Sequence, residues 1–126
     1  MRVESLVFRV GAVHLAVELR WVSSVLAIEE ALGVDSLDPR PWLGIGEGEA
    51  PPEEARVGLL DLPGPPTVLY LGELVGARTL TAEEVLVVPG WLARHLPPIL
   101  RPACVAGDEK VVWMLDLDTL RERVSP

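Results

Sequence analysis

The sequence predicts a single, mostly β domain made of small β-barrels with short helices. Its 126 residues are the usual length of one domain. Short runs rich in valine and leucine alternate with polar residues, and 11 glycines and 12 prolines separate these runs. Several short strands at close spacing, with turn residues between them, are typical of a small barrel or sandwich.

The N-terminal segment carries the clearest strand pattern. Apolar side chains occupy every second position over 6–10 and again over 13–19, with Gly11 between the two runs. This alternation predicts an antiparallel hairpin with one buried and one solvent-facing side. The chain then stays apolar, but Ser23 and Ser24 interrupt the alternation, so we expect a bend or bulge there.

Residues 29–55 predict a long acidic loop. Prolines and glycines break this stretch repeatedly, and only 41–45, which contains Trp42, is strongly apolar. A segment of this composition cannot bury enough apolar area to offset the entropy of ordering it. We therefore expect a loop with one anchor at Trp42.

Strand character returns after residue 56. The predicted strands are 57–62, 67–71, 99–105 and 111–117, with short helical segments over 81–84, 91–96 and 118–124. We therefore divide the single domain, 1–126, into three parts. Residues 1–28 form the opening hairpin of a first, truncated barrel, 29–55 form the acidic loop, and 56–126 form a complete second barrel with its closing strand and helix.

Charge and cysteine content exclude several classes of partner and compartment. The net charge is −8, with only one lysine and scattered arginines, so nucleic acid is not an expected partner. No apolar run approaches 18 residues and the N-terminus lacks the pattern of a signal peptide, so we expect no direct membrane insertion. Cys104 is the only cysteine and has no disulfide partner within the chain, which favours a reducing, cytoplasmic location.

No residue pattern predicts an active site. The candidate bases are His14 and His95 and the candidate thiol nucleophile is Cys104, but their spacing matches no known catalytic or zinc motif. We interpret the histidines as surface residues and Cys104 as a small buried apolar residue. The prediction is a protein without enzymatic activity, metal or cofactor, in which the four tryptophans serve as core or interface anchors.

Three segments in order resemble CheW-type coupling proteins of bacterial chemotaxis. They are Leu6–Gly11 with the strand that ends at Val25, then 56–81 with its Pro-Gly turn, and then Ile99–Leu120 with its Gly-Asp turn. The resemblance implies two small SH3-like β-barrels and no catalytic activity. It also implies an adaptor that joins the cytoplasmic tip of a chemoreceptor to the regulatory domain of a histidine kinase.

The chain departs from the family pattern between its opening hairpin and residue 56. The family has a Gly-x-x-Asn-Leu-Arg-Gly turn and a strand pair there, whereas this chain has the acidic loop 29–55. This departure is why the first barrel is predicted to be truncated. In the family the first barrel carries kinase docking, so receptor docking is the firmer of the two expectations.

The resemblance also places a partner-binding surface at the end of the second strand and on the strand that faces it. The predicted contact residues are Val22, Ser24, Val25, Val57 and Leu59. An independent argument comes from the alternation, which breaks after Leu19, so that Val22 and Val25 cannot both be assigned to the core. An apolar residue outside a barrel is a candidate binding residue.

Two alternatives stay open for these residues. In the first, Val22 and Val25 simply pack between the two barrels. In the second, the protein is a self-associating structural or interaction protein whose truncated barrel is completed by a second copy through an exposed sheet edge.

Overall fold

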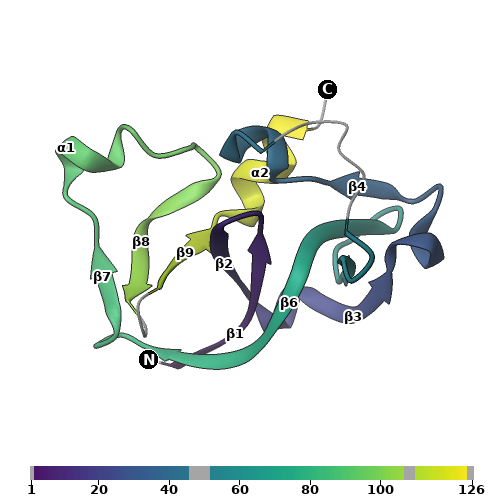
Figure 1. The fold of residues 1–126 in the computed structure, drawn as a ribbon, viewed down its shortest axis with the longest axis horizontal. Coiled ribbons are helices and arrows are strands. Elements are labelled where there is room, and N and C mark those ends of the chain that lie inside the picture. The colour runs from purple at the N-terminus through teal and green to yellow at the C-terminus, as the bar shows by residue number, and fades with distance from the viewer. Residues whose placement is uncertain (1, 46–51, 107–109, 125–126) are drawn as a thin grey trace.

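The computed structural model describes residues 2–45, 52–106 and 110–124 (Figure 1). Strands dominate these residues, and the helices are short. The strands are β1 (Arg2–Val10), β2 (Val13–Glu18), β3 (Val22–Ala27), β4 (Asp35–Leu37), β5 (Arg56–Leu60), β6 (Thr67–Thr81), β7 (Val85–Val87), β8 (Leu100–Ala106) and β9 (Val111–Leu115). The α-helices are α1 (Gly90–Ala93) and α2 (Leu117–Val124), and the 3₁₀ turns are η1 (Leu19–Trp21), η2 (Ile28–Ala31) and η3 (Arg40–Leu43). The predicted mostly β fold with short helices is confirmed.

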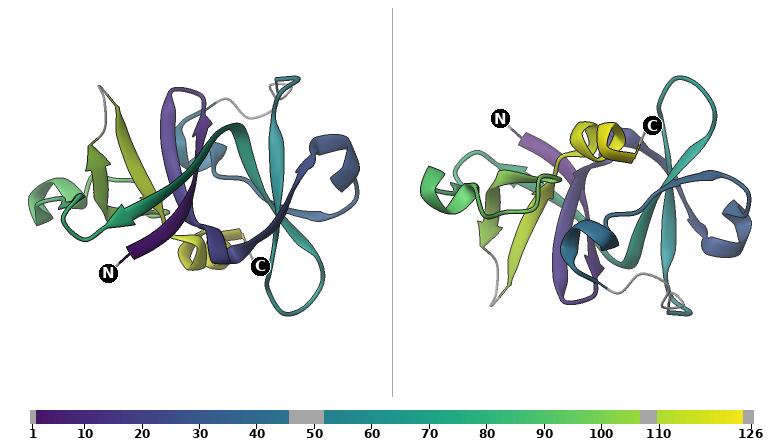
Figure 2. Two further views of the ribbon diagram at one scale, coloured as in Figure 1. Left: turned by 90° about the horizontal axis from the view of Figure 1, so that it is seen from below. Right: turned by 90° about the horizontal axis from the view of Figure 1, so that it is seen from above.

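The strands hydrogen-bond in the order β3-β5-β6-β1-β2-β9-β8-β7, and β4 pairs with β6 outside this path. The pairing divides the molecule into two lobes that share β6 (Figure 2). Lobe A contains β1, β2, β7, β8 and β9 with the C-terminal half of β6. Lobe B contains β3, β4 and β5 with the N-terminal half of β6.

Strand β6 bends sharply where it passes from lobe B to lobe A. At the bend, Gly72 has a φ of +59°, and a Cβ there would lie 2.4 Å from the carbonyl oxygen of Arg9. Only glycine combines this backbone angle with so close an approach. The predicted strand over 67–71 therefore does not stop at Gly72, and it continues to Thr81 by pairing with β1.

The main hydrophobic core lies on one face of the β1–β2 hairpin. Phe8 and Leu15 from the hairpin, Leu69 and Leu71 from β6, and Leu120 from α2 are all fully buried there. Burying each such side chain contributes about 1.5–3 kcal/mol. Helix α2 thus covers one side of this core with its apolar residues Leu117 and Leu120.

A second cluster fills the inside of lobe A on the opposite face of the hairpin. Its buried members are Val7, Ala16, Leu80, Val105 and Val112. The prediction of one buried and one solvent-facing side is therefore wrong near the middle of the hairpin, where side chains on both faces are buried. The polar positions Arg9 and Glu18 lie toward its ends, which is why the sequence suggested a wet face.

The division of the chain into lobes differs from the predicted division into 1–28, 29–55 and 56–126. The opening hairpin β1–β2 pairs with β9 in lobe A, whereas β5 pairs with β3 in lobe B. Each lobe therefore combines segments from both halves of the sequence. Local patterns identify strands but not their long-range partners, so the barrel membership could not be read from them.

The acidic stretch 29–55 contains regular structure in its described part. Strand β4 pairs in parallel with the start of β6, and its Leu37 is buried in the main core. Trp42 in η3 also packs against that core, as its predicted role as an anchor requires. Strand β4 was not expected, because a three-residue strand with two polar positions gives no alternation to detect.

Candidate partner-binding surface

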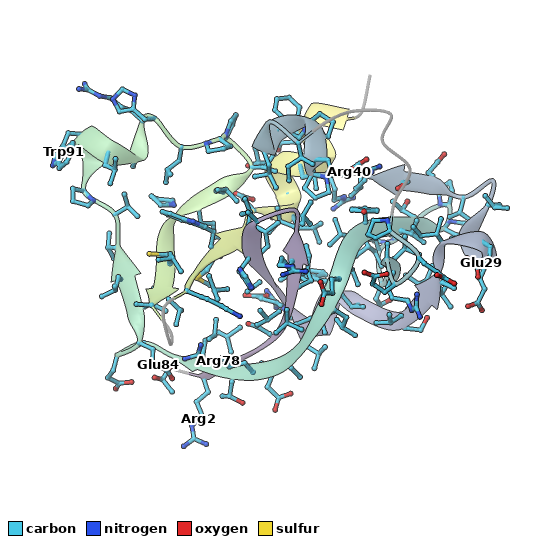
Figure 3. All side chains as sticks on the ribbon, in the orientation of Figure 1. Arg2, Glu29, Arg40, Arg78, Glu84 and Trp91 are labelled. Atoms are coloured by element: carbon cyan, nitrogen blue, oxygen red, sulfur yellow. The ribbon has the colours of Figure 1, made fainter. Side chains whose placement is uncertain are left out.

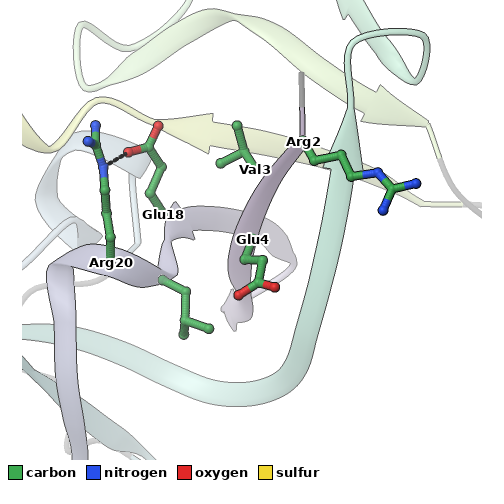
Figure 4. A pocket seen from close by; sticks show the side chains of 6 residues that line it. Arg2, Val3, Glu4, Glu18 and Arg20 are labelled. Atoms are coloured by element: carbon green, nitrogen blue, oxygen red, sulfur yellow. Dashed lines mark hydrogen bonds and ion pairs between the residues drawn. The ribbon is translucent and has the colours of Figure 1, made fainter.

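A hollow opens where the chain passes from lobe A to lobe B. Its volume is about 520 Å³, and it is lined by Arg2–Glu4 from β1 and by Glu18–Arg20 from the end of β2 and η1 (Figure 4). It forms because β1 continues toward its N-terminus along β6, while the chain leaves β1 after the Ser5–Glu18 pair. The departing strand therefore leaves an uncovered corner beside β1.

Charged side chains surround this hollow. Arg20 donates a hydrogen bond from Nε to Glu18 Oε2 at 2.5 Å (Figure 4). The same guanidinium lies 4.6 Å from the centre of the Trp21 ring, and the Arg20 side chain is 70% exposed. Because the Arg20 side of this ion pair is solvent-exposed, the pair adds little to stability.

Strand β3 continues from η1 and forms the adjacent surface. It pairs with β5 alone among the described strands, so its other edge is open. The register shifts between Val22 and Ser24, which makes Ser23 the extra residue of a bulge, and Ser23 Oγ donates a hydrogen bond to the Leu59 carbonyl at 3.1 Å. The bend or bulge predicted from the broken alternation is present at these serines.

The structure brings the five predicted contact residues together on β3 and β5, with different degrees of burial. Ser24 is exposed, and Val25 is 39% exposed. Val22 and Leu59 are half-buried, and Val22 packs against the main core. Val57 is only 4% exposed and belongs to a small core cluster in lobe B, so it supplies no surface contact.

A second apolar surface lies at the other end of the molecule. It consists of Leu86 and Val87 in β7 with Trp91 and Leu92 in α1, and we name it the β7–α1 patch. Val87 is 80% exposed and Trp91 is 67% exposed. Figure 3 shows Trp91 and Glu29 at opposite ends of the molecule, so the patch is remote from η2 and the neighbouring strand β3.

The residues considered for catalysis do not form a site. His14 lies on β2, His95 follows α1, and Cys104 is buried in β8 opposite Leu86 and Trp113. Over 2–45, 52–106 and 110–124 the structure has no group of three His, Cys, Asp or Glu side chains placed to hold a metal ion. No helix within those residues is both long and apolar enough to cross a lipid bilayer.

The sequence analysis did not predict two surface features, the hollow of Figure 4 and the β7–α1 patch. The lining of the hollow begins at Arg2, and nothing in the pattern marks Arg2–Glu4 as different from the rest of its strand. The β7–α1 patch did leave a signal, because the segment from Val85 to Ala106 contains no Asp or Glu in a chain of net charge −8. Such a segment would be unusual for ordinary solvated surface in so acidic a protein.

Comparison with known proteins gives a likeness of fold. No protein-family model matches the sequence, and no curated protein matches it. Among solved structures, the scaffolding protein TtCheW from Thermoanaerobacter tengcongensis superposes with a TM-score of 0.71 at 14% sequence identity. The match covers 95% of this chain and 88% of that protein. The chain therefore has a CheW-like fold, as its sequence segments suggested.

Proposed function

We propose that this chain is a non-catalytic, cytoplasmic adaptor of a bacterial chemosensory or motility system. The observation that carries the proposal is the presence of two separate surface regions with exposed apolar side chains, a small one at Val25 on β3 and a larger one at the β7–α1 patch. An adaptor holds two partners at once and therefore needs two surfaces that do not overlap. The CheW-like fold supports the choice of a chemosensory system.

The β3 surface is proposed to dock the cytoplasmic signalling tip of a chemoreceptor. Along β3, Val25 and the half-buried Val22 lie on one face of the β3–β5 pair, and Ser24 and the half-buried Leu59 lie on the other. The start of β3 follows η1, which lines the hollow of Figure 4. A small apolar centre beside a charged rim is the usual anatomy of a protein interface. Arg20, which is 70% exposed and paired with the half-buried Glu18, would supply part of that rim.

The β7–α1 patch is proposed to dock the regulatory domain of a histidine kinase. Tryptophan is among the residues that contribute most when they are buried at an interface. Trp91 is mostly exposed in the free protein, and Val87, in the strand that precedes α1, is more exposed still. Covering both would remove a large apolar area from water.

Self-association is a second candidate function, and the open edge of β3 favours it. An unpaired strand edge offers backbone donors and acceptors that a second copy can complete. In that case β3 would be covered by another copy of this chain in place of a receptor.

Two matched variants test the proposal. Val25→Asp and Val87→Asp each place a carboxylate on one of the two surfaces, at positions exposed enough to tolerate it. The chemoreceptor cytoplasmic fragment and the kinase regulatory domain from the same genome serve as partners in biolayer interferometry. We expect Val25→Asp to weaken receptor binding at least about tenfold and to spare the kinase, with the reverse pattern for Val87→Asp.

Sedimentation velocity of the protein alone separates the two candidate functions. The adaptor proposal expects a monomer at micromolar concentration in both the natural protein and Val25→Asp. A dimer that Val25→Asp dissociates would favour self-association through β3. Absence of binding to both partners, with a folded protein, would refute the adaptor proposal.

A further inference from the structure

A second hollow of about 400 Å³ opens in lobe A and shares no lining residue with the hollow of Figure 4. Its floor contains Val7 and Val112, each 6% exposed, which belong to the cluster inside lobe A. In the strand registers, Val7 lies opposite Gly76 and His14 lies opposite Val112. Because paired residues share a face of the sheet, all four side-chain positions face the same space.

A β-bulge creates the opening. Val7 pairs with Gly76 and Phe8 pairs with Leu74, so Val75 is the extra residue of β6. The bulge leaves Val75 55% exposed on the wall of the hollow. Gly76 contributes no side chain, and no atom lies within 4 Å of the place where its Cβ would be. The space between β1 and β6 is therefore open at a place where side chains would fill it in a regular pair of strands. Bulges commonly occur beside functional sites.

The rim of the hollow carries His14, Arg78 and Lys110, and none of its described lining residues is a carboxylate. Arg78 is neutralised by Glu84, whose Oε2 lies 2.7 Å from Arg78 Nη2. Lys110 forms no ion pair with any residue that the structure describes. Among the described residues, the hollow thus combines apolar walls with one ammonium group, that of Lys110, which has no ion-pair partner.

His14 adds a hydrogen-bond donor to the same rim. Burial lowers its pKa first, Lys110 and Arg9 lower it further, and Glu73 opposes them. The imidazole is therefore neutral at pH 7 and offers one N–H donor. Arg9 and Glu73 form an ion pair with each other, which leaves Lys110 as the cation with the fewest competing partners.

We propose that this hollow binds a small carboxylic acid with an apolar chain. The chain would lie against Val7, Val75 and Val112, and the carboxylate would meet Lys110 and the imidazole of His14. The volume falls within the usual range for small-molecule sites, which are mostly apolar with a few placed polar groups and often lie in the mouths of β-barrels. The proposal does not depend on the adaptor function.

The first test is an NMR titration of the ¹⁵N-labelled full chain with hexanoate, hexanol and hexylammonium at equal concentrations. We expect hexanoate to shift the amide signals of Val7, His14, Gly76 and Val112 in a saturable manner. Hexanol should bind several-fold more weakly and hexylammonium should cause no comparable shifts. Equal shifts with all three compounds, or hexanoate shifts centred on the β7–α1 patch, would overturn the proposal.

A matched pair of variants at the exposed bulge residue provides the second test. Val75→Lys should strengthen hexanoate binding about threefold and Val75→Glu should weaken it by about the same factor, since charge pairs near the surface have modest effects. Val87→Glu introduces the same charge at the β7–α1 patch, outside the residues that line the hollow, and should leave the affinity unchanged. An affinity that is the same in Val75→Lys and Val75→Glu would show that the carboxylate does not bind at this rim and would refute the site.

Discussion

The two ends of the sheet, β3 and β7, both have an open edge among the described strands, yet they present different surfaces. The β3 end combines a bulge, two serines and the acidic η2, and its most exposed valine is only 39% exposed. The β7 end carries Val87 and Trp91 at 80% and 67% exposure, in a segment without Asp or Glu. The first end is small and acidic, and the second is large and apolar.

This difference indicates that the two edges are protected from unwanted pairing in different ways. Bulges and charges disfavour edge-to-edge contact along β3, and β7 is only three residues long and is followed closely by Pro89. Strand addition is therefore disfavoured at β7, and at β3 a second copy would have to accommodate the bulge and the nearby charges. The large exposed side chains at the β7 end are better explained by a side-chain interface than by pairing of strands.

The largest expected effect follows the burial gradient across β3 and β5. Val57→Asp should lower the free energy of unfolding by about 3–5 kcal/mol, because it places an unpaired charge among buried side chains. Val22→Asp should cost less because Val22 is half-buried, and Val25→Asp should cost least. Urea denaturation followed by circular dichroism gives all three values. An equal loss for Val22→Asp and Val25→Asp would mean that both valines are core residues, and the β3 surface would be withdrawn.

The next effect concerns the bend in β6 that separates the two ends. In Gly72→Ala the new Cβ meets the Arg9 carbonyl oxygen in a left-handed backbone, so we expect a loss of about 3 kcal/mol. Gly64→Ala is the control, since Gly64 also has a positive φ but open space around its Cβ position, and it should cost about 1 kcal/mol. Thermal unfolding compares the two variants. Equal losses would show that the close approach at Gly72 relaxes easily.

Local sequence patterns predicted the elements that depend on neighbouring residues. The β1–β2 hairpin follows from its alternation and the Gly11 turn, and the bulge follows from Ser23 and Ser24. The continuation of β6 past Gly72 could not be predicted from the residue itself, because a glycine in a strand usually weakens it. Its role depends on the Arg9 backbone, which lies 63 positions away in the sequence and becomes a neighbour only through pairing.

The candidate site shows the same limit. The broken alternation could not assign both Val22 and Val25 to the core. In the structure the bulge at Ser23 places both on one face of the β3–β5 pair, where Val22 is half-buried and Val25 is 39% exposed. The sequence could not show that Val57 is buried, because β5 is a short apolar run without alternation, as in strands that are covered on both faces. The hollow of Figure 4 depends on where β2 leaves β1, which is a property of the assembled sheet.

The third prediction compares one tryptophan from each region. Trp42 is half-buried and packs against the main core, whereas Trp91 is mostly exposed. We expect Trp42→Ala to cost about 2 kcal/mol, below the range for a fully buried aromatic residue, and Trp91→Ala to change stability by less than about 0.5 kcal/mol. Tryptophan fluorescence and chemical denaturation report both. A large loss for Trp91→Ala would place α1 in the core and remove the β7–α1 patch as a docking surface.

The smallest expected effect lies in the turn that leads into β7. Hydrogen bonds from Thr81 and Arg78 lower the pKa of Glu84 below its ordinary value of 4.5, so the ionised carboxylate is favoured in the folded protein. A lowered pKa contributes stability that is present above the unfolded value and is lost as pH falls through the folded one. The urea midpoint of the natural protein should therefore fall slightly more than that of Glu84→Gln between pH 6 and pH 3.

Glu83→Gln, one residue away and without an ion pair among the described residues, serves as the control and should follow the natural protein. If Glu84→Gln shows the same pH dependence as Glu83→Gln, the Arg78–Glu84 pair does not stabilise the turn.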